Sequence, residues 1–96
     1  MAIQSFADQA TEDFWNGVVT ARSRKIETIG KVARRKLDML HFAAVLTDLL
    51  IPTGNRLEAL KGDLAGLHSI RINDQWRICF RWRDGNAFEI EIVDYH

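Results

Sequence analysis

The spacing of apolar residues changes at residue 67, and this change limits the possible folds more than any other feature. Before that point apolar residues recur every three or four positions, as they do along one face of a helix. After it, apolar and polar residues alternate in segments 69–72, 76–83 and 88–92, which predicts strands with one buried face. We therefore expect an α+β fold, in which a short N-terminal strand and two main helices pack on a C-terminal antiparallel sheet.

The chain has 96 residues, of which 47% are hydrophobic and 27% charged, so we expect one globular domain over residues 1–96. No apolar run approaches the roughly 20 residues that span a bilayer, and the N-terminus lacks the pattern of a signal peptide. Cys79 is the single cysteine, which excludes an internal disulfide and fits a reducing compartment. These features predict a cytoplasmic protein with no membrane partner.

The first helix is expected shortly after the N-terminus. Ala10, Phe14 and Val18 recur every four residues, and Asn16-Gly17 offers an end to the helix. Residues 3–6 precede this pattern and are expected to form the short strand.

The second helix is expected to run from Ile26 to Ala44, because apolar residues form one continuous stripe over that span. Gly30 weakens its first turns, at a cost of about 1 kcal/mol relative to alanine. We expect Thr47 to cap one further turn before residues 52–55 break the chain. The stripe consists of Ile26, Ile29, Ala33, Leu37, Leu40 and Ala44.

The alternation also predicts how the strands pair. The apolar positions are even-numbered on all three strands, so directly paired residues should sum to an even number. Three-residue loops at 73–75 and 84–86 satisfy this rule, whereas a two-residue turn at Asp84-Gly85 would place Phe80 opposite Glu89. The predicted pairs are Ile70 with Ile78, Phe80 with Ile90, Trp82 with Phe88, and Arg81 with Glu89.

On the polar face this register places Arg71 opposite Arg77, and Arg77 opposite Val93 with Tyr95 on the diagonal. Two directly opposed arginines are unfavourable unless something negative lies between them. The planar fork of arginine donates two parallel hydrogen bonds and suits phosphate. This part of the sheet is therefore a candidate anion site.

Basic residues are concentrated in two segments, although the net charge is zero. Residues 22–36 hold seven basic side chains against the single acid Glu27, and residues 56–83 hold six more. The simplest interpretation of the first segment is a solvated helix face. Contact with ribosomal RNA is the second interpretation, because phosphate attraction needs charge without base recognition.

The sequence offers no pattern for a metal or a cofactor. His41, His68 and His96 are scattered and Cys79 stands alone, so no ligand pair has zinc-like spacing. Lys61-Gly62-Asp63 is not followed by a helix with a Ser or Thr, so it does not form a phosphate-cradling loop. We expect no metal and no cofactor.

Arg71, Arg77 and Lys61 are expected near the terminal Asp94-Tyr95-His96. Such a set could cleave RNA without a metal: the 2′-hydroxyl attacks its own phosphate, a base removes its proton and cations stabilise the transition state. Arginines on the polar face of a sheet are also commonly just solvated, and a terminal Tyr-His is often frayed. The residues alone leave both interpretations open.

Three motifs together resemble the HigB toxins of the RelE-like superfamily. They are Leu60-Lys61-Gly62-Asp63, the stretch Asn73-Asp74-Gln75-Trp76-Arg77-Ile78 and the closing Asp94-Tyr95-His96. The N-terminal residues 3–6 and the basic stretch 34–40 look like that family too, so the resemblance covers nearly the whole chain. It implies a RelE-like fold and a metal-independent, ribosome-dependent endonuclease that cuts mRNA and inhibits translation.

The resemblance also implies roles for individual residues. Arg77 would stabilise the scissile phosphate, and His96, with Asp94 and Tyr95 beside it, would supply acid–base chemistry and orientation. Lys61 matches a position that contacts phosphate. Apart from the resemblance, Arg71, which the register places opposite Arg77, and Arg56 are further candidates for phosphate contacts. Some family members carry a histidine where this chain has Glu58. A carboxylate with an ordinary pKa near 4.3 can accept a proton at pH 7 but cannot donate one.

The partners implied are a HigA-type helix-turn-helix antitoxin, the ribosome and mRNA, with operator DNA bound only through the antitoxin. One alternative keeps the fold but lacks nuclease activity, as in gyrase-directed relatives of RelE. Another is a non-catalytic co-repressor that acts by binding the antitoxin.

Overall fold

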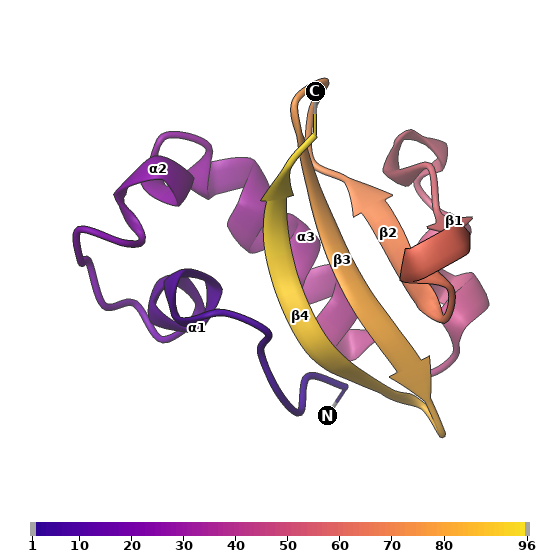
Figure 1. The fold of residues 1–96 in the computed structure, drawn as a ribbon. Helices are drawn as coiled ribbons and strands as arrows, with labels where there is room; N and C mark the ends of the chain where they lie inside the picture. Colours follow the sequence, from indigo (N-terminus) through magenta and orange to yellow (C-terminus); the bar gives the residue numbers. More distant parts are fainter. Residues whose placement is uncertain (1, 96) are drawn as a thin grey trace.

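A four-stranded antiparallel sheet forms the frame of the protein, in a computed structural model that describes residues 2–95 (Figure 1). The strands lie in chain order: β1 (Glu58–Ala59), β2 (Leu67–Arg71), β3 (Trp76–Arg83) and β4 (Asn86–Asp94). The three expected strands are therefore confirmed. The sequence did not predict β1, because two residues are too few to show an alternation.

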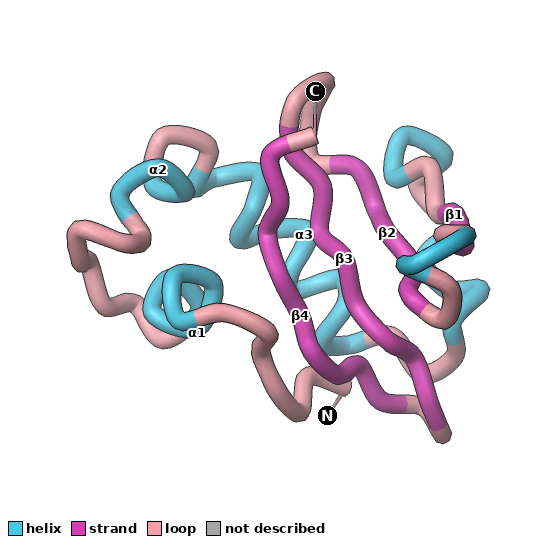
Figure 2. Tube along the Cα trace, in the orientation of Figure 1, coloured by secondary structure: helices cyan, strands magenta, loops and turns pink. Residues whose placement is uncertain are grey.

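Three α-helices lie before the sheet in the chain: α1 (Gln9–Trp15), α2 (Arg24–Glu27) and α3 (Gly30–Phe42). In Figure 1, α3 lies behind the sheet and α1 and α2 lie beyond the edge formed by β4. Short 3-10 turns, η1 (Leu46–Leu50), η2 (Thr53–Asn55) and η3 (Gly62–Leu64), connect α3 to β1 and β1 to β2 (Figure 2). This arrangement confirms the predicted α+β class. No helix of the described residues is long and apolar enough to cross a membrane.

The core lies between α3 and one face of the sheet. Fully buried apolar side chains of α3 meet those of β2, β3 and β4, and each such side chain contributes about 1.5–3 kcal/mol by leaving water. The other face of the sheet, called here the outer face, carries most of the polar residues. The central members of the core are Ala33, Leu37, Leu40, Ile70, Ile78, Phe80 and Ile90.

The helical half differs from prediction in three places. The expected helix from residue 26 to 44 breaks after Glu27, and α3 begins at Gly30, the residue at which the pattern was weakest. Val18 lies beyond the end of α1 and is half exposed, so it does not belong to the buried face of that helix. Thr47 lies inside η1, and the carboxylate of Asp48 accepts the capping hydrogen bonds from the amides of Ala44 and Val45.

The N-terminal segment runs parallel to β4 and pairs with it at two isolated positions, which confirms its extended conformation. Ile3 pairs with Ala87 and Phe6 with Ile90. Farther along the same edge, the amide of Ile92 donates to the hydroxyl of Thr11 at 2.9 Å. These contacts satisfy backbone groups that an open sheet edge would expose.

The hairpin between β3 and β4 corrects the predicted register. Its loop is the two-residue turn that the alternation disfavoured: Asp84 and Gly85 both have positive φ, and Trp82 pairs with Ala87. A β-bulge then shifts the register, because two residues of β4, Glu89 and Ile90, lie opposite Phe80 alone. Glu89 takes a positive φ of 53° at this point.

The bulge changes which side chains face the core. Ala87, before the bulge, and Ile90, after it, are both fully buried, although one number is odd and the other even. The prediction that Phe88 faces inward opposite Trp82 is therefore wrong. On the far side of the bulge the predicted pairing of β3 with β4 holds, with Arg77 opposite Val93. Between β2 and β3 the predicted pair of Ile70 with Ile78 is present, and the loop at 73–75 is as predicted.

A buried polar contact joins α3 to the segment that leads into β1. Lys36 is 7% exposed as a residue, and its ammonium donates to the side-chain oxygen of Asn55 at 2.5 Å. The Asn55 amide nitrogen in turn donates to the carbonyl of Leu49 at 3.1 Å. Asn55 therefore fixes η1 and η2 against α3, and with them the start of β1.

We predict that Asn55→Ala destabilises the protein by about 1–3 kcal/mol, because it leaves the Lys36 ammonium and the Leu49 carbonyl buried without a partner. Urea denaturation at pH 7 measures the change, with the exposed neighbour Thr53→Ala as the control. A loss no greater than that of the control would show that Asn55 does not hold the segment.

Burial, and then the neighbouring charges of Arg35 and Arg71, lower the pKa of Lys36 from its usual 10.5. In the window between this lowered pKa and 10.5 the unfolded chain binds more protons at this site, so its contribution to stability rises with pH. We predict that Lys36→Met removes this rise. The measurement is the free energy of unfolding from pH 7 to 10, and Lys31→Met, an exposed lysine of the same helix, should keep the wild-type slope.

Candidate functional site

Arg77 lies at the centre of a cluster on the outer face of the sheet. Its Nη1 donates to the hydroxyl of Ser69 at 2.6 Å and lies 3.5 Å from Oε1 of Glu58. The ring of Tyr95 lies beside the guanidinium, 5.6 Å from ring centroid to Cζ. The Arg77 side chain is only 14% exposed, so its charge is partly withdrawn from water.

Strand pairing brings these four residues together. Glu58 of β1 pairs directly with Ser69 of β2, and Arg77 of β3 pairs with Val93 of β4. Tyr95 follows two residues after Val93, and its amide donates to the carbonyl of Gln75. The site therefore takes one side chain from each strand or its end, all on one face.

The free groups of Arg77 define what the cluster can bind. Among the described residues, Nε and Nη2 of Arg77 have no hydrogen-bond partner. A guanidinium with two unpaired donors in a partly dehydrated position suits a planar pair of oxygens on an oxyanion. The cluster is thus chemically suited to hold a phosphate and to stabilise added negative charge on it.

Arg71 lies directly opposite Arg77, as predicted. The anions next to the two arginines come from within the chain: Glu58 at Arg77, and the exposed carboxylate of Asp74 at Arg71. The expected ion pair of Arg81 with Glu89 is also present at 3.0 Å, although the bulge prevents them from being directly opposed. Arg81 is therefore occupied away from the cluster.

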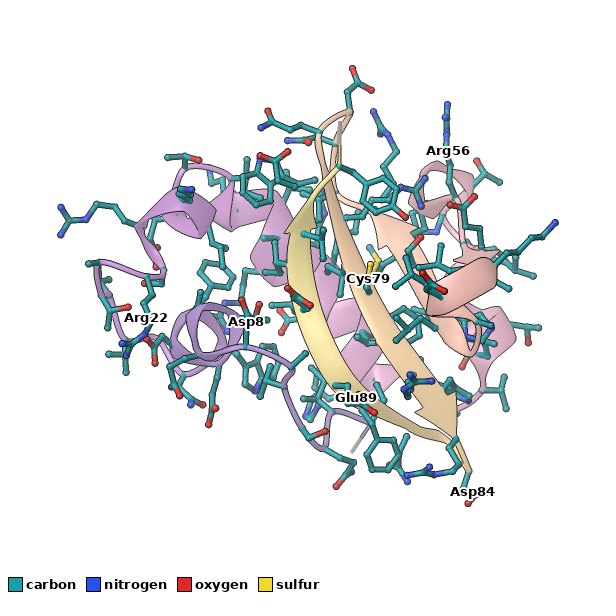
Figure 3. All side chains as sticks on the ribbon, in the orientation of Figure 1. Asp8, Arg22, Arg56, Cys79, Asp84 and Glu89 are labelled. Carbon is teal, nitrogen blue, oxygen red and sulfur yellow. The ribbon has the colours of Figure 1, made fainter. Side chains whose placement is uncertain are left out.

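Lys61 and Arg56 flank β1 and are both exposed. Arg56 ends η2 in a left-handed conformation with φ of 46°, and in Figure 3 its side chain extends away from the protein at the upper right. Lys61 precedes η3. Neither contacts Arg77, so they lie around the cluster rather than in it.

The terminal motif divides. Tyr95 joins the Arg77 cluster, whereas Asp94 pairs with Trp76 and its carboxylate accepts from the Gln75 amide at 3.1 Å. Because neighbouring residues of a strand point to opposite faces, Asp94 faces away from Arg77. His96 lies outside the described residues.

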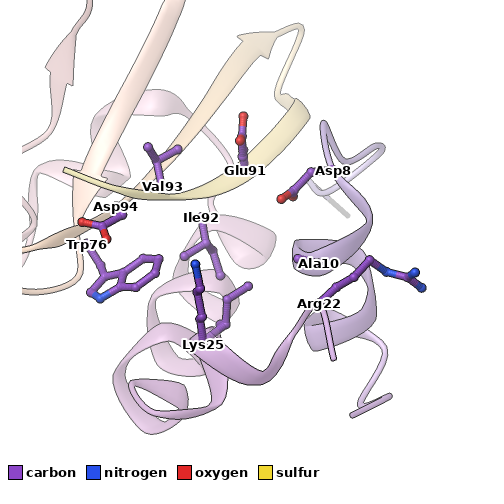
Figure 4. Close-up of a pocket in the computed structure, with 10 residues that line it drawn as sticks. Asp8, Ala10, Arg22, Lys25, Trp76, Glu91, Ile92, Val93 and Asp94 are labelled. Atoms are coloured by element: carbon purple, nitrogen blue, oxygen red, sulfur yellow. The ribbon is translucent and has the colours of Figure 1, made fainter. Parts of the chain in front are cut away.

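A separate cleft of about 240 Å³ lies between the α1–α2 region and β4 (Figure 4). Its polar lining includes the carboxylates of Asp8, Glu91 and Asp94 and the basic side chains of Lys25 and Arg22. Burial, and then the charge of Asp8, raise the pKa of Glu91. The sequence did not predict this cleft, because four segments that are separate in the chain form it.

Three side chains of the basic segment 22–36 bind within the protein, and for Arg34 and Lys36, which are not exposed, the prediction of a solvated helix face is wrong. Arg22 pairs with Asp13, Lys36 binds Asn55, and Arg34 donates to the carbonyls of Phe14 and Trp15 at the end of α1. Arg22 is exposed despite its pair with Asp13. Four further basic residues are exposed and have no ion-pair partner among the described residues: Arg24, Lys25, Lys31 and Arg35.

Sequence reasoning did not single out Ser69 as a site residue, because a serine carries no charge and the alternation places it simply on the polar face of its strand. The predicted register could nevertheless have identified Ser69. It pairs Ser69 with Cys79 and Arg71 with Arg77, so Ser69 lies on the same face as Arg77 and diagonally across from it. Its burial, at 0% exposed, distinguishes it from an ordinary polar-face serine.

The comparisons with known proteins agree on one family. The family model described as RelE-like toxin of type II toxin-antitoxin system HigB matches residues 4–96. The chain is 43% identical over 88 residues to Toxin HigB-1 of Vibrio cholerae serotype O1, which covers 91% of this chain and 90% of that protein. It is also 42% identical over 41 residues to Endoribonuclease HigB of Proteus vulgaris, covering 43% of this chain and 45% of that protein.

Solved structures support the fold independently. A YoeB–YefM complex from Staphylococcus aureus contains a chain that superposes with a TM-score of 0.63 at 24% identity, covering 100% of this chain and 97% of that chain. At this identity the likeness concerns the fold alone. Taken with the family match over residues 4–96, it confirms the resemblance seen in the motifs: the chain belongs to the HigB-like family of RelE-like toxins of type II toxin-antitoxin systems.

Proposed function

We propose that this toxin is an endoribonuclease that cleaves mRNA on the ribosome, with Arg77 at the scissile phosphate. The observation that carries the proposal is the guanidinium of Arg77, mostly buried yet with Nε and Nη2 unpaired among the described residues. The name of the Proteus vulgaris relative, Endoribonuclease HigB, supports the same activity.

The reaction that fits these side chains needs no metal. The 2′-hydroxyl oxygen attacks the adjacent phosphorus, and the new 2′-oxygen–phosphorus bond forms as the phosphorus–5′-oxygen bond breaks. A base takes the proton of the 2′-hydroxyl and an acid returns a proton to the 5′-oxygen, leaving a 2′,3′-cyclic phosphate and a 5′-hydroxyl. Arg77 stabilises the charge that builds on the phosphate oxygens.

We assign the base to Glu58 and the acid to His96. Glu58 lies 3.5 Å from Arg77, so a phosphate held by Arg77 brings the 2′-hydroxyl near its carboxylate. A carboxylate can take up a proton but has none to give at neutral pH, so the donor is sought at the chain end. The ring of Tyr95 lies beside the Arg77 guanidinium. The carboxylate of Asp94 accepts a hydrogen bond from Gln75, and we propose that it orients the chain end in this way.

The surrounding charges fit binding along an RNA backbone. Arg71, Lys61 and Arg56 lie around the Arg77 cluster and would contact flanking phosphates. The four exposed basic residues of α2 and α3 would contact ribosomal RNA, because backbone phosphates attract cations without regard to base sequence. A toxin that acts on the ribosome would work in the cytoplasm, which is the location we propose for it.

For its partner we propose a HigA-type helix-turn-helix antitoxin, which neutralises the toxin and carries it to operator DNA. The family belongs to toxin-antitoxin systems, so an antitoxin is expected. The toxin itself would bind DNA only through that protein.

We predict that Arg77→Ala lowers mRNA cleavage at least about 100-fold, because removing one donor to a developing oxyanion costs this much. The measurement is mapping of mRNA 5′-ends after induction without antitoxin, together with growth arrest. Arg81→Ala, which removes an outer-face arginine that is paired with Glu89, is the matched control and should cleave normally. Full cleavage by folded Arg77→Ala would refute the assignment, and arrest with DNA damage but no new mRNA ends would favour a gyrase-directed toxin.

We predict that Glu58→Gln lowers the cleavage rate by about 10²- to 10⁴-fold, because the amide cannot accept the proton of the 2′-hydroxyl. Glu89→Gln is the matched control, since it changes another outer-face carboxylate that pairs with an arginine. Single-turnover cleavage of mRNA on purified ribosomes gives both rates. If Glu58→Gln cleaves as fast as Glu89→Gln, the base lies elsewhere.

A further inference from the structure

Ser69 is a fully buried serine on the outer, polar face of the sheet. It pairs with Glu58 on one side and with Cys79 on the other, so it lies in the middle of a row that crosses three strands. Its hydroxyl oxygen accepts from Nη1 of Arg77 at 2.6 Å. This is the shortest contact that Arg77 makes with a described residue.

The contact decides which edge of the Arg77 guanidinium stays free. Ser69 and Glu58 both lie against Nη1, at 2.6 and 3.5 Å. The ring of Tyr95 lies beside the guanidinium, with 5.6 Å from its centroid to Cζ. The pair of donors that no described residue contacts is Nε and Nη2, so this edge is the one left free for two oxygens of a phosphate.

Electrostatics explains why Arg77 needs to be held. Arg71 is paired directly opposite Arg77, and like charges in directly opposed positions of neighbouring strands repel each other. The Glu58 carboxylate is 53% exposed and holds Arg77 at a longer distance, so water weakens its attraction. The buried hydroxyl of Ser69 is a fixed, water-shielded acceptor, and it can keep the guanidinium in one orientation.

We infer that Ser69 is a positioning residue, which fixes Arg77 so that its Nε/Nη2 edge faces the scissile phosphate. The inference rests on the proposed function, in which Arg77 holds that phosphate. Ser69 itself does not touch the substrate. Its effect reaches the reaction through the orientation of one guanidinium.

The test compares Ser69→Ala with Cys79→Ala, which removes a buried polarisable atom at the directly paired position but no hydrogen bond to Arg77. We expect Ser69→Ala to lower kcat for cleavage of ribosome-bound mRNA by about 10- to 100-fold, with KM within about threefold of wild type. Cys79→Ala should stay within about twofold of wild type in both. Thermal unfolding checks that each variant is folded.

A second measurement separates positioning from a structural role. In an Arg77→Lys background there is no guanidinium edge to orient, so Ser69→Ala should change kcat by no more than about twofold. An equal loss of kcat in both backgrounds would mean a structural role and overturn the inference. If Ser69→Ala does not fold, Ser69→Cys replaces it in the test, because a thiol is only a weak acceptor. The kcat of Ser69→Cys should also fall, while its KM should stay near that of wild type.

The outcomes distinguish this inference from the proposed function. Wild-type kcat in folded Ser69→Ala, with Arg77→Ala inactive, would overturn the role of Ser69 and leave the role of Arg77 intact. Normal cleavage by Arg77→Ala would instead overturn the proposed function, and the inference with it.

Discussion

The packing of α3 against one face of the sheet is the contact on which the rest of the structure depends. Leu37 and Leu40 of α3 are fully buried against Ile70, Ile78 and Phe80. Because side chains alternate along a strand, committing one face to this core leaves the other face to polar residues. The Arg77 cluster lies on that second face. The core on the opposite face holds its strands in place, and no residue of the cluster belongs to that core.

The charges of the chain serve two purposes that the sequence does not separate. Arg34 binds two carbonyls at the end of α1, and Lys36 reaches Asn55 inside the protein. Both sit among exposed basic residues of the same helix, so composition alone treats them as one patch. Only the structure tells which cations hold the fold together and which remain available to an RNA backbone.

In the hairpin between β3 and β4, the rule that inward-facing residues alternate predicted the wrong turn, and a β-bulge is the physical reason. Strict alternation demanded that inward residues keep one parity, and this excluded the tight turn at Asp84-Gly85. A bulge at Glu89 lets the chain have both the tight turn and an apolar inner face, since one extra residue resets the alternation. The bulge lies between Arg77 and the turn at Asp84-Gly85. The pairing of Arg77 with Arg71 and Val93, on the other side of the bulge, was therefore still predicted correctly.

The sequence by itself determined the fold class, the three long strands, the opposition of the two arginines and, through its motifs, the family. Periodicity and turn residues act over short distances, so they can be read from neighbouring positions. Tertiary structure alone decided that Glu58 meets Arg77, that Ser69 is buried and bonded to it, and that one edge of the guanidinium stays free. These facts depend on β1, which at two residues is too short to show an alternation, and on the burial of a serine that the alternation assigns only to the polar face.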